Sequence, residues 1–252
     1  MPQSSLLPRA GVSKRSKITS RAYPSVQSVM TRTEVAELRE KVEEMKKRLR
    51  EVSRINTKAG ISRLWDKIEK RPDGDYYLGR KVIGRDTGIN KGVYIGNGAR
   101  EAIVVDRKYG AIDRLFEKAK QRATVNGVVD ESRVPQAVFD TVKEAMPIQS
   151  REEVQKIIDE KKVGQEGKIA LDIFIDRGVG VCRHDSLACA AVLEVFKEKG
   201  MIHGTPHVER NIDERGGHGW CTLELNGEKI VLDIPNNLLK KLKETTEEEW
   251  TY

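Results

Sequence analysis

The chain has 252 residues, of which 34% are charged and 38% are hydrophobic, and it carries a formal net charge of +7. A chain of this length can bury a sizeable core in one domain with appendages. It has no run of about 20 apolar residues, which excludes a membrane-spanning helix, and its start lacks the apolar segment of a secretory signal peptide. Its three cysteines do not suit a disulfide framework, so we expect a reducing, cytoplasmic location.

The positive charge is concentrated at the N-terminus. Residues 1–32 contain six Arg and Lys residues and no acid, so the rest of the chain is close to neutral. Such a tail could contact nucleic acid, anionic lipid or an acidic partner, could be an organelle transit peptide, or could only solubilise the protein. No basic face is visible in the remaining sequence to support nucleic-acid binding. We predict that residues 1–30 are disordered, because they lack hydrophobic periodicity and contain several helix breakers.

An amphipathic, coiled-coil-like helix is expected over residues 31–57. Thr31 and Glu34 form a capping box at its start. Apolar residues then recur at alternating spacings of three and four, at Val35, Leu38, Val42, Met45, Leu49 and Val52. A parallel dimer would place Lys41 against Lys46, and like charges at these positions repel. Docking on the protein's own body, an antiparallel pairing or a different helix partner is therefore favoured.

Two further regions follow. Residues 58–105 are expected to form a small β-rich region, with β-prone pieces at 81–83, 92–95 and 102–105. Residues 106–252 are expected to form the catalytic domain. Apolar residues at helical spacing predict helices in this domain within 112–119, 138–146, 154–158 and 169–175.

A cysteine stands where a long apolar helix should begin. Glycines at 178 and 180 predict a sharp turn immediately before Cys182. The helix dipole and the free N–H groups at a helix start favour a thiolate. Cys182 is therefore the candidate nucleophile, with its own backbone N–H as an oxyanion donor. Cys189 is expected in the core, and His184 should diverge from the thiol along the helix. No cysteine pair has zinc-ligand spacing, so we expect no metal and no cofactor.

The Asn226-Gly227 pair predicts a two-residue hairpin turn between two strands. A two-residue loop fixes the register, so Leu225 should lie opposite Glu228. Counting outward then places Trp220 opposite Asp233. This prediction depends only on the length of the turn.

The alternation along the two strands separates their residues into two faces. His218 shares a face with Trp220 and lies diagonal to Asp233, at a Cβ separation of roughly 7–8 Å that permits an imidazole–carboxylate hydrogen bond. The other face is apolar and takes Cys221 into the core. A cysteine, a histidine and a carboxylate are what thiol acyl chemistry needs. We therefore expect Cys182, His218 and Asp233 to form a catalytic triad.

Three ordered motifs resemble the transglutaminase-like, papain-fold superfamily. They are Gly180-Val-Cys182-Arg, His218-Gly-Trp220 and Leu232-Asp233-Ile-Pro235. The resemblance covers residues 150–236. It implies an α+β fold in which a buried helix carrying Cys182 packs on an antiparallel sheet. It also implies that Cys182 is the nucleophile, His218 the base and acid, Asp233 the orienting carboxylate, and Trp220 the aromatic neighbour that shields the histidine.

The activity implied by this resemblance is acyl transfer through a thioester, with hydrolysis of an amide or peptide bond preferred. The alternatives are a protein-glutamine γ-glutamyltransferase or deamidase, and a non-catalytic protein-binding module. Ser186 stands where the family often has alanine, and Asp233-Ile-Pro235 replaces its usual Asp-Pro-Thr, so the substrate class stays open. The expected partner is a peptide or protein substrate. A further hypothesis is that the helix at 31–56 covers the cleft as a built-in inhibitor.

Overall fold

The structure is a computed structural model in which the chain divides into two units, residues 1–49 and 50–252. The residues that it describes are 35–45, 47–48, 64, 66–95, 101–161, 167–213, 216–246 and 249. The basic tail, the predicted capping box at Thr31 and the last seam positions lie outside them. No helix among the described residues is both long and apolar enough to span a bilayer.

The described part of the first unit is helical, as predicted, over 35–45 and 47–48. Its large apolar side chains are exposed, at Leu38, Val42 and Met45. These residues recur at spacings of four and three, so they form one apolar stripe along the helix.

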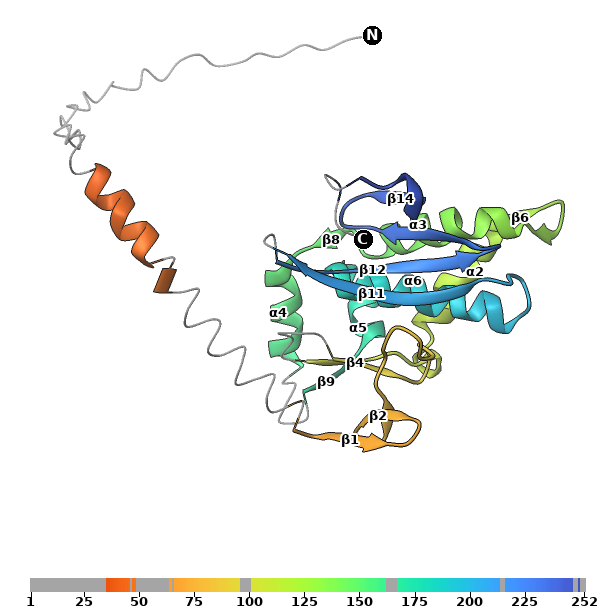
Figure 1. The fold of residues 1–252 in the computed structure, drawn as a ribbon, viewed down its shortest axis with the longest axis horizontal. Coiled ribbons are helices and arrows are strands. Elements are labelled where there is room, and N and C mark those ends of the chain that lie inside the picture. The colour runs from red at the N-terminus through yellow and green to blue at the C-terminus, as the bar shows by residue number, and fades with distance from the viewer. Residues whose placement is uncertain are drawn as a thin grey trace, which may run out of the picture. The chain divides into compact units, whose positions relative to one another are not determined.

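The second unit is α+β, as the sequence predicted (Figure 1). Its helices are α2 (Ala111–Ala123), α3 (Val134–Ala145), α4 (Arg151–Glu160), α5 (Leu171–Arg177) and α6 (Cys182–Glu198). Its strands are β1 (Ile68–Arg71), β2 (Gly74–Tyr77), β3 (Arg80–Lys81), β4 (Val93–Ile95), β5 (Ala102–Val104), β6 (Thr124–Val125), β7 (Val128–Val129), β8 (Ile148–Gln149), β9 (Lys168–Ala170), β10 (Val179–Gly180), β11 (Thr205–Asp213), β12 (Gly216–Leu225), β13 (Glu228–Asp233) and β14 (Leu238–Lys241). Short 3-10 turns cover Arg107–Tyr109, Glu131–Arg133 and Leu242–Glu244.

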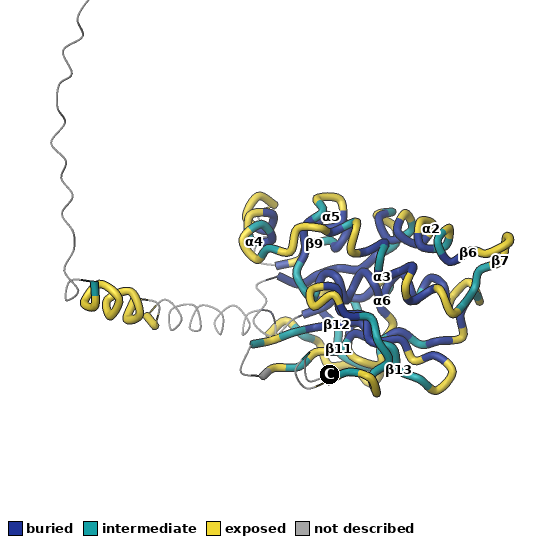
Figure 2. Tube along the Cα trace, turned by 90° about the horizontal axis from the view of Figure 1, so that it is seen from above, coloured by how far each residue is buried: buried dark blue, intermediate teal, exposed yellow. Residues whose placement is uncertain are grey.

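Helix α6 is the central element of this unit. It packs on the antiparallel sheet β11-β12-β13-β14, and α2 and α3 also contact it (Figures 1 and 2). From His184 to Phe196 all of its residues except Glu194 are buried, because the segment is almost wholly apolar. Each fully buried Leu, Val or Phe in such a segment contributes about 1.5–3 kcal/mol relative to an exposed one.

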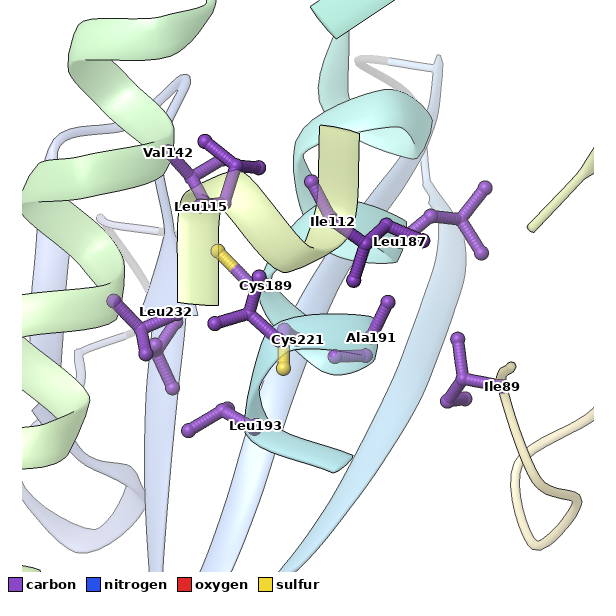
Figure 3. Close-up of a cluster of buried hydrophobic side chains, with 14 of the residues drawn as sticks. Ile89, Ile112, Leu115, Val142, Leu187, Cys189, Ala191, Leu193, Cys221 and Leu232 are labelled. Atoms are coloured by element: carbon purple, nitrogen blue, oxygen red, sulfur yellow. The ribbon is translucent and has the colours of Figure 1, made fainter. Parts of the chain in front are cut away.

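Two of the three cysteines belong to this core, as predicted. The side chains of Cys189 and Cys221 are 1% and 0% exposed. Figure 3 shows both sulfurs among carbon side chains that include Ile112, Leu115, Val142, Leu187 and Leu232. Burial raises the pKa of both thiols, that of Cys189 far above its usual value, so neither is ionised at neutral pH.

The β-rich region at 58–105 shares its core with the helices that follow. Strand β5 pairs with β4 on one side and, in parallel, with β9 on the other, where Ile103 lies opposite Ile169. Tyr94 and Ile103 both belong to the main hydrophobic cluster around α6. Side chains from this region therefore reach the neighbourhood of the start of α6.

The helix expected at 169–175 is shifted in the structure. It begins at Leu171, because residues 168–170 form β9 and satisfy the free edge of β5. Helix α4 begins at Arg151, after Ser150, whose hydroxyl accepts a hydrogen bond from the N–H of Glu153 at 3.2 Å.

Gly204, just before β11, has no room for a side chain. A Cβ there would lie 2.7 Å from Cδ1 of Leu223 and 3.0 Å from the carbonyl oxygen of Glu224. We expect Gly204→Ala to lower the free energy of unfolding by about 1–3 kcal/mol, as overpacking does in other cores. Urea titration measures this change in the free energy of unfolding. The control is Gly217→Ala, whose Cβ would meet its nearest atom at 3.9 Å. Equal stability of the two variants would contradict the prediction.

Candidate active site

The turn before α6 is fixed by the backbone. Gly178 ends α5 in the left-handed conformation, with φ of 67°. Residues 179–180 then pair in parallel with residues 148–149, which holds the turn against β8. Val181 is the N-cap residue and Cys182 is the first residue of α6, so the thiol lies at the helix start as predicted. The first N–H groups of a helix have no partner within it, and they point toward this end.

The hairpin has the predicted turn. Asn226-Gly227 has φ values of 53° and 75°, and these positive values are what a two-residue hairpin turn requires. Leu225 pairs with Glu228, and the register continues to Cys221 opposite Leu232. The apolar face predicted for the two strands is accordingly buried against α6.

The structure brings the three predicted site residues together. Nε2 of His218 lies 2.6 Å from Oδ2 of Asp233, and the side chains are 10% and 0% exposed. Hydrogen bonding by the His218 ring and by the Gly219 backbone lowers the pKa of the Cys182 thiol. Because Asp233 engages Nε2, Nδ1 is the ring nitrogen that remains for the thiol. The order of contacts is therefore thiol, imidazole, carboxylate.

The charges at the site favour an ion pair. Burial alone would lower the pKa of His218, but hydrogen bonds to Asp233 and Cys182 outweigh it and raise the pKa to about 9. Burial alone would raise the pKa of Cys182, but hydrogen bonds from His218 and from the Gly219 backbone bring it below its usual value. A lowered thiol pKa beside a raised imidazole pKa favours the thiolate–imidazolium form near neutral pH.

Trp220 lies beside the imidazole. Its ring centroid is 5.9 Å from that of His218, and the planes are inclined by 27°. The indole is 5% exposed and packs with Val231 and Leu238 in a small apolar cluster. It therefore covers one side of the histidine, where the sequence analysis expected a shielding group.

His184 has a structural place instead. It is fully buried in the first turn of α6, where Nδ1 accepts a hydrogen bond from the N–H of Val181 at 3.2 Å. Its ring lies 4.1 Å from that of Phe174, centroid to centroid. Burial holds its pKa well below the usual value, so the ring is neutral. It caps the helix that carries the thiol.

Asn236 is a site residue that the sequence analysis missed. Its Nδ2 donates to Oδ2 of Asp233 at 2.8 Å, the oxygen that also binds His218. The same Nδ2 lies 3.4 Å from Nε2 of His218. Its backbone N–H donates to Oδ1 of Asp233 at 3.4 Å. Asn236 thus fixes the turn after β13 next to the pair formed by His218 and Asp233. The only signal in the sequence was a polar residue three positions after Asp233.

Removing the Asn236 side chain should weaken the site without unfolding the protein. We expect Asn236→Ala to slow alkylation of Cys182 by iodoacetamide at pH 7 about tenfold, since one hydrogen bond to a charged group contributes about 1.5 kcal/mol or more. The alkylation rate is measured from the labelled peptide that contains Cys182. Urea titration shows whether the variant keeps its stability. The control is Asn237→Gly, which keeps the left-handed backbone of Asn237. An unchanged rate in Asn236→Ala would show that this amide has no influence on the thiol.

Asp185 is a second residue near the site that was not predicted. Asp185 is 1% exposed, and its Oδ1 accepts a hydrogen bond from Nε2 of Gln149 at 3.2 Å. Burial raises the pKa of Asp185 far above its usual value. Its Oδ2 has no partner in the described part of the chain. The Gln149 contact joins β8 to the first turns of α6 and so supports the position of Cys182.

Comparison of the chain with protein-family models, with curated proteins and with solved structures found no match. Within the described residues, no group of three or more His, Cys, Asp and Glu side chains is arranged to hold a metal ion.

Proposed function

We propose that this protein transfers acyl groups through a thioester at Cys182, and that its overall reaction is hydrolysis of an amide or peptide bond. The hydrogen-bonded series from Cys182 through His218 to Asp233 carries the proposal, because it supplies a nucleophile, a proton carrier and an orienting carboxylate. The order of the three motifs, which resembles the transglutaminase-like superfamily, supports it, as does the packing of α6 on an antiparallel sheet, the arrangement expected of a papain-like core.

The proposed reaction has two halves. The Cys182 thiolate attacks the carbonyl carbon, and the developing oxyanion is bound by the backbone N–H at the start of α6. The imidazolium of His218 gives its proton to the leaving amine, and the C–N bond breaks to leave the thioester. Neutral His218 then takes a proton from water, whose oxygen attacks the thioester, so that the acid is released and the Cys182 thiolate and His218 imidazolium are restored. Asp233 keeps the ring oriented throughout.

The chemistry also fits a location. All three cysteines are free. A thiolate nucleophile must stay reduced to act, and the cytoplasm keeps thiols reduced. We propose that the protein acts in the cytoplasm.

Acetylation by p-nitrophenyl acetate tests the proposal. Attack by the thiolate releases p-nitrophenolate and leaves an acetyl thioester that hydroxylamine removes. We expect intact-protein mass spectrometry to find this adduct on Cys182, and to find none in Cys182→Ala. Cys189→Ala, in which a core thiol is removed, should acetylate normally. Persistence of the hydroxylamine-labile adduct in Cys182→Ala would refute the proposal.

The acceptor that releases the acyl group distinguishes hydrolysis from transamidation. The acetylated protein is mixed with methylamine, and acetate and N-methylacetamide are quantified. We expect acetate to dominate. Predominant formation of N-methylacetamide at millimolar amine would assign the protein to the transamidating class instead.

A further inference from the structure

Arg210 of β11 lies next to the candidate nucleophile through the sheet register. It is paired with Gly219 of β12, the residue whose backbone hydrogen-bonds the Cys182 thiol. Directly opposite residues of an antiparallel pair share a face. Gly219 faces α6, since a Cβ on it would lie 3.8 Å from Oγ of Ser186. The side chain of Arg210 therefore leaves the sheet on the face where α6 begins.

The guanidinium of Arg210 contacts residues of β4 and forms no ion pair with a carboxylate of the described residues. Its Nη1 donates to the carbonyl oxygen of Ile95 at 3.3 Å, and the group is also hydrogen-bonded to the hydroxyl of Tyr94. Tyr94 is only 6% exposed, and burial raises its pKa, so the phenol is neutral. A guanidinium has five N–H donors in a planar fork, and these two contacts leave donors of the fork available.

Arg210 differs in this respect from the neighbouring Arg183. The guanidinium of Arg183 donates from both Nε and Nη2 to Glu101, a carboxylate that is 2% exposed, so its charge is balanced. Within the described ranges, no carboxylate forms an ion pair with Arg210. The start of α6 therefore has one neutralised arginine and one that keeps its charge.

We propose that Arg210, fixed by Tyr94 and the Ile95 carbonyl, binds a carboxylate of the substrate next to the carbonyl that Cys182 attacks. Arginine binds carboxylates in a bidentate manner, which adds orientation to charge attraction. The enzyme then prefers acyl groups that carry a carboxylate, such as an acidic side chain or a free C-terminus, over their neutral amides. This inference rests on the proposed function, since it assigns the substrate class of the same site.

Iodoacetate and iodoacetamide are a matched pair of probes for this subsite, because they differ only in the carboxylate. In both reactions the Cys182 sulfur forms a bond to the methylene carbon as the carbon–iodine bond breaks and iodide leaves. The measured quantity is the ratio of the two second-order rate constants, each divided by that for the same cysteine in urea. We expect wild type to favour iodoacetate about tenfold by this ratio, the lower end of what a charge-assisted hydrogen bond provides.

Substitutions distinguish the effect of Arg210 on this preference from the effect of the protein's overall charge. Arg210→Gln should abolish the preference while its iodoacetamide rate stays near that of wild type, which also reports that the site is folded. Arg210→Lys keeps the charge without the fork and should retain part of the preference. The control is Arg114→Gln, which removes the same charge from an exposed ion pair with Asp176 and should change nothing.

The outcomes distinguish this inference from the proposed function. An unchanged preference in Arg210→Gln overturns the subsite. So does a wild-type Cys182 that reacts rapidly with iodoacetamide and shows no preference for iodoacetate, and this result leaves the proposed function standing. If Cys182 reacts no faster than Cys189 and Cys221 with either reagent, both proposals fail.

Discussion

Replacing His218 with alanine should slow alkylation of Cys182 by iodoacetamide at pH 7 by about 100-fold. The reason is electrostatic. Cys182 is partly buried, and burial by itself raises the pKa of a thiol; the hydrogen bond to His218 is the first of the contacts that reverse this. Without the imidazolium, the thiol should titrate at or above its usual pKa, so little thiolate remains at pH 7.

The pH profile carries more information than the single rate. In wild type, the rate should rise at a pH below the usual thiol pKa and then stay level until His218 loses its proton near pH 9. In His218→Ala, one rise at the pKa of an isolated, half-buried thiol should replace this profile. His203→Ala is the control, because the His203 side chain is 87% exposed. If Cys182 in His218→Ala is alkylated at a rate within threefold of wild type, His218 does not activate the thiol.

The parts of the site that could be predicted are those with local causes. Asn226-Gly227 allows one tight turn, and a turn of known length determines which residues face one another. The glycines at 178 and 180 and the apolar segment after Cys182 determine where α6 begins. In both places the local sequence determines the backbone conformation. The spacing of residues along the chain was therefore enough to predict that His218, Asp233 and Cys182 lie together.

The parts that were missed depend on contacts between distant segments. Arg210 meets Tyr94 because β11 and β4 both lie at the start of α6, and no periodicity in either strand indicates that meeting. The boundary of α5 was wrong for a related reason. Residues 169–170 continue the apolar segment of the helix in the sequence, but in the structure they pair with β5, which satisfies backbone groups of both strands. Tertiary contacts overrode the local preference.

Asp233→Asn should lower the pKa of His218 from about 9 toward the usual value of about 6.5. The carboxylate is fully buried and accepts from Nε2, so it is the strongest stabiliser of the imidazolium. An asparagine keeps the shape of the side chain and removes its charge. The protein has four histidines, so the ring resonance can be assigned by comparison with His218→Ala and titrated by NMR. Iodoacetamide alkylation at pH 7 should slow about tenfold as the ion pair weakens.

The same substitution should change how stability depends on pH. A histidine whose pKa is raised in the folded state stabilises that state fully below the unfolded pKa of about 6.5, and this stabilisation is lost as pH rises through the folded pKa. The Cys182 thiol has a lowered pKa and titrates in the opposite sense, so the comparison is made in a Cys182→Ser background. There, the Cys182 contribution to the raised His218 pKa is gone and the Asp233 contribution remains. The free energy of unfolding should fall as pH rises from about 6.5 through the folded-state pKa of His218, and adding Asp233→Asn should flatten that fall. Asp159→Asn, an exposed carboxylate on α4, removes an equal charge and should leave the fall intact. The same slope in all three proteins would mean that Asp233 does not hold the proton on His218.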